Sequence, residues 1–143
     1  MKAKTHLDAG AFFQQHEPIL VHRFKCHITE APNLPPFLVK SVKLPKMSEG
    51  KWDCLVIDLY RAEDINILDE IQKIASIDTM VPVNVKVQEL RPDGSHEATF
   101  SFEDANLTEV QLPELNHEKD DISTVRLTFK NFKLNYVTNK DLQ

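Results

Sequence analysis

The chain has 143 residues, of which 41% are hydrophobic and 27% are charged, so it can bury a core and is too apolar for wholesale disorder. Its net charge of −5 argues against a protein that holds nucleic acid by its phosphates, because such proteins gather Lys and Arg into a patch. No stretch approaches the roughly 20 apolar residues of a membrane span, and residues 1–15 lack the apolar segment of a signal peptide. We therefore expect a cytosolic product without a membrane anchor.

Residues 1–18 predict an N-terminal arm, because they mix charged and small residues and end at Pro18. We expect residues 19–138 to form one domain and residues 139–143 a loose C-terminal tail. The arm carries Phe12 and Phe13, and an exposed aromatic pair usually docks on a surface. That surface is either the chain's own domain or a neighbouring subunit.

Residues 21–46 predict two strands with a proline-rich corner between them. Apolar and polar side chains alternate over 23–29, which is the period of a half-buried strand. The corner at 31–36 contains three prolines, and proline lacks the amide proton that a sheet interior requires. The second strand, 36–45, is apolar on both faces, with Val39 assigned to one face and Val42 to the other. Such a strand is either covered on both sides or meets a neighbouring subunit.

Residues 51–60 predict a central strand, since apolar residues occupy both of its faces. Residues 62–79 then switch to the i, i+3, i+4, i+7 spacing of an amphipathic helix that packs against a sheet. We expect Asp64 to cap this helix and Glu70 to lie on its solvent side.

Residues 81–102 predict a hairpin around the turn sequence RPDG at 91–94. A short strand at 107–112 and an acidic loop are expected next, followed by one long strand over 122–137 with Val125, Leu127 and Phe129 facing inward. The order β–β–β–α–β–β–β predicts a mainly β fold with a single α-helix. Its expected form is an antiparallel sandwich or barrel with the helix packed at one side.

No catalytic or cofactor-binding pattern stands out, so we expect neither an enzyme nor a cofactor. His22, Cys26 and His27 do not make a metal site, because Cys26 and His27 point to opposite faces of a strand and no second cluster supplies further ligands. Cys26 and Cys54 are expected to be reduced, half-buried thiols, and whether they ever pair stays open.

The phrase LPPFLVKSVKLPK at 34–46, followed by a Trp-containing strand that ends in LY, resembles the tail tube proteins of contractile-tailed bacteriophages. The resemblance runs from about residue 21 to 137 and rests on strand order and one proline-bounded phrase. It implies a structural virion protein that forms hexameric rings, each lined by one continuous β-barrel. The rings would stack into the inner tail tube, the conduit for genome delivery.

The resemblance also implies partners and a location. The partners would be further copies of the chain and the sheath, baseplate and tail terminator proteins, with double-stranded DNA passing without specific binding. The location would be the phage tail, assembled in the cytoplasm of the host bacterium. An acidic chain suits a bore that must not retain phosphates.

Two sets of residues become candidates under this resemblance. The candidates for subunit contacts are Phe12, Phe13, Leu34, Pro35, Pro36, Phe37, Val39, Val42 and Leu44. The candidates for lining the lumen are Asn84, Lys86, Gln88, Glu97, Thr99 and Ser101.

Three alternatives stay open. The 103–121 region is short for the family, which would suit a tube initiator in a baseplate. The chain could also be another β-sandwich adaptor or binding module of a phage tail or injection device. A small-ligand carrier or enzyme built on a closed barrel is the third alternative. The same fold serves headless injection devices, so DNA is an implied cargo only.

Overall fold

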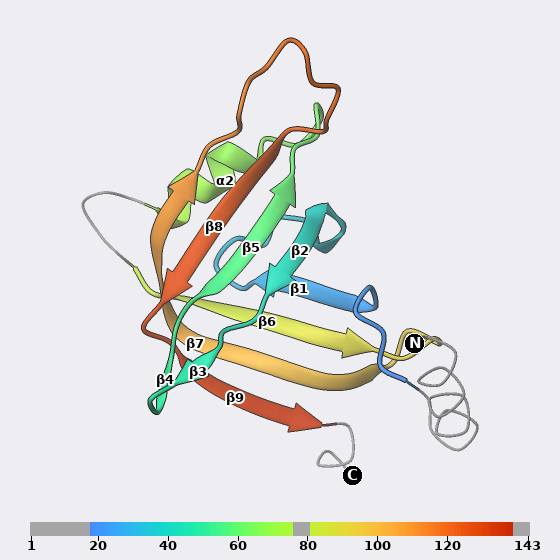
Figure 1. The fold of residues 1–143 in the computed structure, drawn as a ribbon, viewed down its shortest axis with the longest axis vertical. Coiled ribbons are helices and arrows are strands. Elements are labelled where there is room, and N and C mark those ends of the chain that lie inside the picture. Colours follow the sequence, from blue (N-terminus) through green and yellow to red (C-terminus); the bar gives the residue numbers. More distant parts are fainter. Residues whose placement is uncertain (1–17, 76–80, 139–143) are drawn as a thin grey trace, which may run out of the picture.

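The computed structural model describes residues 18–75 and 81–138 (Figure 1). The calls on Phe12 and Phe13, on the N-terminal arm up to residue 17 and on the C-terminal tail fall outside these ranges. The elements are β1 (Phe24–Ile28), the 3₁₀ helix η1 (Pro36–Leu38), β2 (Val39–Lys43), β3 (Met47–Ser48), β4 (Lys51–Trp52), β5 (Leu55–Tyr60), α2 (Ile67–Ile74), β6 (Val83–Leu90), β7 (His96–Gln111), β8 (Thr124–Lys130) and β9 (Lys133–Thr138).

The fold is mainly antiparallel β with one α-helix in the described ranges, as the sequence predicts. Two sheets share the long strand β7. Sheet A has the order β1-β6-β7-β9, and sheet B has the order β2-β5-β8-β7. In Figure 1 the strands of sheet A run across the view, whereas β5 and β8 of sheet B are steeply inclined and point in opposite directions. The sheets do not close into a barrel, because β1 and β2 each pair with one strand only.

Strand β7 is bent, and the bend lets it serve both sheets. Its first half pairs with β6 and β9, and its second half pairs with β8. Asp104 at the bend has a left-handed backbone with φ of 55°, and its N–H donates to Asn84 Oδ1 at 3.2 Å. The prediction of a separate short strand at 107–112 is therefore wrong, since one 16-residue strand spans the region.

The prediction of one long strand over 122–137 is also wrong. Asn131 adopts a left-handed backbone with φ of 59°, which breaks the segment into β8 and β9. The two strands pair with opposite halves of β7, so β8 belongs to sheet B and β9 to sheet A. The inward facing of Val125, Leu127 and Phe129 is confirmed, since all three are buried.

A bulge corrects the faces assigned to the 36–45 segment. Its first residues form η1, and the pairing of β2 with β5 shifts register between Val39 and Ser41. The extra residue, Lys40, reverses the alternation, so that Val39 and Val42 both pack against the core rather than facing opposite ways.

The 51–60 segment is two strands rather than one. The chain turns at Asp53, whose Oδ1 accepts from the N–H groups of Lys46 and Cys54, both at 2.7 Å. These two backbone hydrogen bonds lower the pKa of Asp53. Residues 51–52 instead form a two-stranded hairpin with β3, in which Trp52 lies opposite Met47. Strand β5 is flanked on both sides, by β8 and β2, which confirms an interior position in its sheet.

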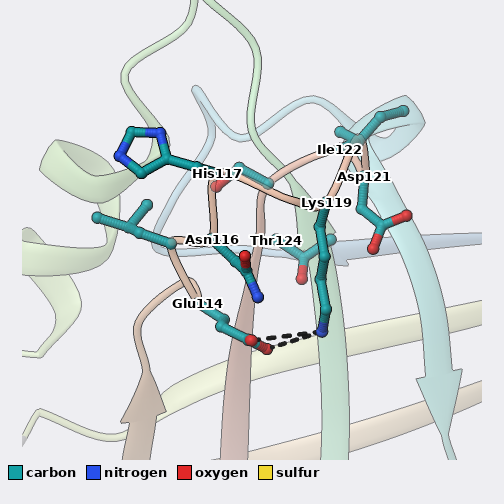
Figure 2. A pocket seen from close by; sticks show the side chains of 9 residues that line it. Glu114, Asn116, His117, Lys119, Asp121, Ile122 and Thr124 are labelled. Carbon is teal, nitrogen blue, oxygen red and sulfur yellow. Dashed lines mark hydrogen bonds and ion pairs between the residues drawn. The ribbon is translucent and has the colours of Figure 1, made fainter.

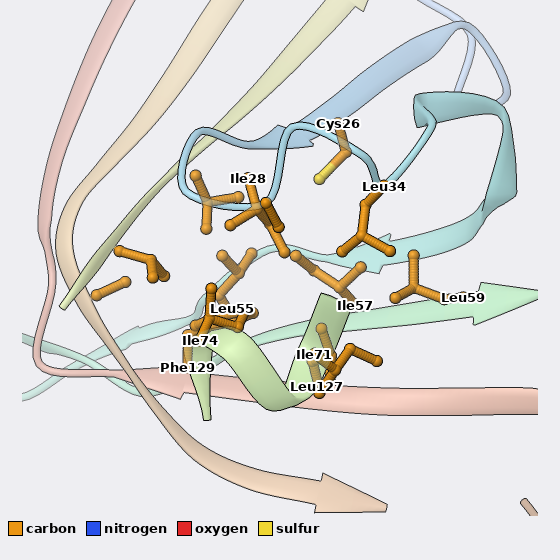
Figure 3. Close-up of a cluster of buried hydrophobic side chains, with 14 of the residues drawn as sticks. Cys26, Ile28, Leu34, Leu55, Ile57, Leu59, Ile71, Ile74, Leu127 and Phe129 are labelled. Carbon is orange, nitrogen blue, oxygen red and sulfur yellow. The ribbon is translucent and has the colours of Figure 1, made fainter. Parts of the chain in front are cut away.

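The core lies between the inner faces of the two sheets and is covered by α2 and the proline-rich corner (Figure 3). Each large aliphatic or aromatic side chain buried here contributes roughly 1.5–3 kcal/mol. The main members of this core are Cys26, Ile28, Leu34, Leu38, Leu55, Ile57, Leu59, Ile67, Ile71, Ile74, Val83, Val85, Val87, Phe102, Val125, Leu127 and Phe129.

Helix α2 is capped by Asn66 and not by Asp64, because Asn66 Oδ1 accepts from the N–H of Asp69 at 3.1 Å. Glu70 is buried rather than on the solvent side. Its carboxylate accepts from Lys73 Nζ at 2.6 Å, and this hydrogen bond lowers the pKa of Glu70. A long aliphatic stem lets Lys73 reach back along the helix from an exposed position, so the charge of Glu70 is compensated.

Replacing Asn131 by Val should destabilise the protein by about 1–2 kcal/mol, because a β-branched residue is strained at the left-handed backbone of the β8–β9 turn. Asn131→Gly is the matched control and should be close to neutral, since glycine adopts this conformation freely. Urea unfolding of both variants checks the prediction. A Val variant as stable as the Gly variant would contradict it.

Candidate functional site

Sheet A has one polar face, on the side away from the core. Cross-strand partners on this face are polar: Gln88 lies opposite Thr99, and Lys86 lies opposite Ser101. The apolar partners that alternate with them, such as Val85 and Phe102, are buried in the core. Four of the residues expected to line a lumen are thus neighbours on two paired strands.

The other two lumen candidates lie at opposite ends of the same strands. Asn84 donates from its Nδ2 to Glu30 Oε2 at 2.9 Å and from its backbone N–H to Oε1 at 2.7 Å. Glu97 accepts from Arg91 Nε in an ion pair. Hydrogen bonding to Glu97 raises the pKa of Arg91. Both candidates are therefore engaged within the chain, whereas the side chain of Lys86 makes no hydrogen bond or ion pair in the described ranges.

Sequence reasoning missed half of this face, because it confined the face to the 81–102 hairpin. Strand β1 adds Lys25 opposite Gln88 and His27 opposite Lys86. Strand β9 adds Asn135 opposite Ser101 and Lys133 opposite Glu103. The polar positions of the alternating segments 24–28 and 133–138 were the available signal, but only the pairing order shows that they join one face.

The polar face is not acidic, in contrast to the chain. Three lysines on it outnumber two glutamates, which gives a local charge of +1 against −5 for the whole sequence. Its charged members are Lys25, Lys86, Lys133, Glu97 and Glu103. The negative charge of the chain is therefore not carried by this face, because most of the acidic residues lie elsewhere.

Both edges of sheet A are open among the described strands. Strand β1 pairs only with β6, and β9 pairs only with β7. The N–H of Leu90 donates to the carbonyl of Arg23, and that of Thr29 to the carbonyl of Asn84, both at 2.9 Å. Alternation along an antiparallel strand then directs the amide groups between them toward the open side of β1. These amides belong to Phe24, Cys26 and Ile28.

The same alternation shows which backbone groups of β9 face away from β7. Cys26, Val87, Phe100 and Tyr136 form one row across the four strands. The N–H and C=O groups of Cys26 point away from β6, so those of its partner Val87 point toward β7 and bond to Phe100. The groups of Phe100 are thereby used toward β6, so those of Tyr136 point away from β7. The backbone groups of Cys26 and Tyr136 thus face the two outer edges at the same level of the sheet, and no described strand pairs with them there.

The subunit-contact candidates at 34–44 do not form one exposed surface. Phe37 is 75% exposed and Leu44 is 37% exposed, so both could meet another chain. Leu34 is only 6% exposed, and it belongs to the core of its own chain. Val39 and Val42 pack partly buried against that core. Pro35 and Pro36 are half-buried at the start of η1.

The outer face of sheet B carries a polar network in place of an apolar groove. Arg126 donates from Nε to Asp58 Oδ1 at 2.8 Å and from Nη2 to Asp58 Oδ2 at 3.2 Å. Ser41 Oγ donates to the same carboxylate at 3.2 Å. The hydrogen bonds from Arg126 are the main cause that lowers the pKa of Asp58. This bidentate ion pair links β8 to β5, and the hydrogen bond from Ser41 links β2 to β5.

The described residues contain no group of three His, Cys, Asp or Glu side chains placed to hold a metal ion. Cys26 is a free thiol in the core, fully buried rather than half-buried, and burial raises its pKa to about 12. Cys54 is a free, half-buried thiol. No helix in the described ranges is long and apolar enough to cross a membrane.

No known protein family and no curated protein matches the sequence. Several solved structures resemble the fold, among them the following three. A chain from the sheath/tube terminator of an extracellular contractile injection system has a TM-score of 0.70 at 13% identity, covering 87% of this chain and 99% of that one. A chain of the anti-feeding prophage baseplate scores 0.62 at 14% identity, over 88% and 99%. Hcp1 from Salmonella typhimurium scores 0.55 at 10% identity, over 82% and 96%.

At these identities the similarity establishes the fold. The chain therefore has the fold found in Hcp1 and in chains of contractile injection systems. For the fold, the resemblance to tail tube proteins is confirmed.

Replacing Asp58 by Asn should lower the free energy of unfolding at pH 7 by about 1 kcal/mol, the upper range for a partly exposed ion pair. Because the pKa of folded Asp58 lies below its ordinary value of 3.8, this contribution is present above that pH and is lost as the pH falls through the lowered value. Urea unfolding at a series of pH values measures it. Asp121→Asn, at an exposed loop position, is the control, and a wild-type advantage that persists at the lowest pH would refute the assignment.

Proposed function

We propose that this chain is a structural subunit that closes into hexameric rings through the two open edges of sheet A. The rings stack into the inner tube of a contractile tail, the conduit through which a genome is delivered to a host cell. The observation that carries this proposal is that, among the described strands, β1 and β9 of sheet A each pair on one side only, around a polar face. An open strand edge readily pairs with a strand of another chain, and a second copy of this chain supplies such a strand.

The strand directions support closure between copies. Neighbouring strands of sheet A are all antiparallel, and their number is even. Strand β9 of one copy therefore runs antiparallel to β1 of the next, and the pairing can continue until the ring closes. Six copies would give a barrel of roughly 24 strands, with a circumference of at least about 115 Å at roughly 4.8 Å per strand. Barrels of 16–18 strands already enclose an aqueous channel.

The polar face suits the inside of such a channel, because the opposite face is committed to the core. Its charges are few and are separated by uncharged side chains such as Gln88, Thr99 and Ser101. A polar surface without a cluster of cations favours passage of double-stranded DNA without specific binding. The same surface would also pass a protein cargo, so the genome is the more specific part of the proposal.

The solved structures with this fold support the partners and the location. One comes from a six-fold symmetrised baseplate and another from a sheath–tube complex. We infer that the chain contacts sheath, baseplate and terminator proteins in the tail of a virion or injection particle assembled in a bacterial cytoplasm. In this role it has no catalytic activity.

A second candidate role is that of a tube initiator or terminator, which caps one end of a tube. The structural similarity to chains of a tube terminator and a baseplate favours it, with TM-scores of 0.70 and 0.62. A capping protein would form single rings that fail to stack by themselves, whereas a main tube protein would give stacks of variable length. A β-sandwich adaptor would remain a monomer.

Tyr136→Pro should abolish rings and leave the fold intact. The amide of Tyr136 points to the open edge of β9, so proline removes a donor needed by the next copy and none used in pairing with β7. Tyr136→Ala is the matched control, because it also loses the ring packed at 4.8 Å on Phe100 but keeps the amide. Negative-stain electron microscopy and light scattering should give monomers for the Pro variant and rings for the Ala variant.

Circular dichroism checks that both variants are folded. Rings in the folded Pro variant would show that β9 is not the closing edge. A wild-type protein that stays monomeric at every concentration would overturn the ring proposal and favour an adaptor.

A further inference from the structure

One end of sheet B carries an exposed apolar and basic surface. The β3–β4 hairpin projects there (Figure 1), with Met47 52% exposed and Trp52 41% exposed as cross-strand partners. A hollow of about 540 Å³ lies between this hairpin and the β8–β9 turn, lined in part by Trp52, Phe132, Lys51 and Lys130. Exposed aromatic and sulfur-containing side chains at such a hollow are typical of a contact surface.

Cations outnumber anions around this hairpin. Four lysines and two acidic residues in 46–53 and 130–133 give a local charge of +2. They are Lys46, Lys51, Lys130, Lys133, Glu49 and Asp53. All six are exposed. We call this region, 46–53 with 130–133, the basic end.

The loop 112–123 forms the opposite end of sheet B, and we call it the acidic loop. It also exposes large apolar side chains, since Leu112, Leu115 and Ile122 are 65%, 86% and 65% exposed. Four carboxylates and one lysine give it a charge of −3 with His117 neutral. The ionised residues are Glu114, Glu118, Asp120, Asp121 and Lys119.

The acidic loop compensates little of its own charge. Figure 2 shows Lys119 turned toward Glu114, with Nζ 3.3 Å from Oε1. Asp121 and Ile122 lie on the other limb of the loop and line the same hollow as Lys119. Glu118, Asp120 and Asp121 form no ion pair among the described residues. The loop thus presents apolar side chains among carboxylates that outnumber its one lysine, with Arg61 bonded to Ser123 at its base.

The two surfaces cannot meet within one copy. Strand β5 begins at Leu55, directly after the hairpin, and ends at Tyr60, next to Arg61, whose N–H donates to the carbonyl of Ser123 at 2.9 Å. Six extended residues place the two ends roughly 20 Å apart. Figure 1 shows the hairpin and the loop at opposite ends of the molecule.

We propose that the basic end of one copy docks on the acidic loop of a second copy, and that this contact stacks successive rings. The inference rests on the proposed function, in which the edges of sheet A are already used within the ring. Two different surfaces that fit each other make a head-to-tail contact, and such a contact repeats without limit when it does not close. Trp52 and Met47 are the apolar anchors, with Leu115 and Ile122 as their partners, and the opposite charges fix the register.

A charge exchange tests this contact. Lys46→Glu with Lys51→Glu reverses the basic end, and Glu118→Lys with Asp121→Lys reverses the acidic loop. None of these four side chains makes a hydrogen bond or ion pair within the described residues, so the fold should tolerate the changes. Each double variant should form rings but need at least about tenfold more protein to stack, because like charges then face each other in every copy of the ring.

The chain with all four substitutions keeps the net charge of −5 and should regain stacking. Lys25→Glu with Lys86→Glu is the matched control, because it changes the net charge as much as the reversed basic end but lies on the polar face of sheet A. Its concentration for stacking should stay within about twofold of the wild type. Sedimentation velocity and negative-stain electron microscopy distinguish single rings from stacks of rings. Circular dichroism checks that each variant is folded.

The outcomes separate the two proposals. Stacking that survives either reversal, or that the four-substitution chain fails to regain, overturns the docking of these two surfaces. Loss of rings in a folded reversed variant overturns the assignment of this contact to stacking. Absence of rings in the wild type overturns the proposed function itself.

Discussion

The bend in β7 is the constraint on which the other features depend. A single 16-residue strand cannot follow two sheets of different direction unless its ladder changes partner, and the left-handed residue Asp104 makes that change possible. Asn84 holds the bend by accepting from the Asp104 amide, and Asn84 is itself held by Glu30.

The shared strand separates the molecule into surfaces of different character. Sheet A keeps one face for the core and one polar face, and among the described strands its outer strands β1 and β9 each pair on one side only. Sheet B is tied together by the Asp58–Arg126 pair, and its two ends carry exposed apolar side chains. Contacts through edges use backbone groups and are indifferent to sequence, whereas contacts through ends depend on side chains. A protein that assembles in two directions would gain specificity from this division.

Charge is distributed along the same division. The polar face is close to neutral, the hairpin end is basic and the 112–123 loop is strongly acidic, so the overall charge of −5 describes none of them. An argument from net charge alone therefore misjudges what each surface can contact. Local fields of opposite sign on one chain favour association between copies in a fixed order.

The sequence by itself determined the core faces of β1, β6 and β8, the amphipathic helix and the 91–94 hairpin turn. Those features follow from periods of two and of 3.6 residues and from local turn chemistry, which involve near neighbours only. It also indicated the polar residues of β6 and β7, and a proline-bounded phrase pointed to the fold.

Only the tertiary structure decided that β7 is continuous, that residues 122–137 divide at Asn131, and that a bulge at Lys40 turns Val39 and Val42 to the same side. It alone joined Lys25 and Asn135 to the polar face and placed the hairpin and the acidic loop at opposite ends. The physical reason is that register, bulges and strand order are set by pairing between segments far apart in the chain. The alternation within a segment is compatible with several such pairings.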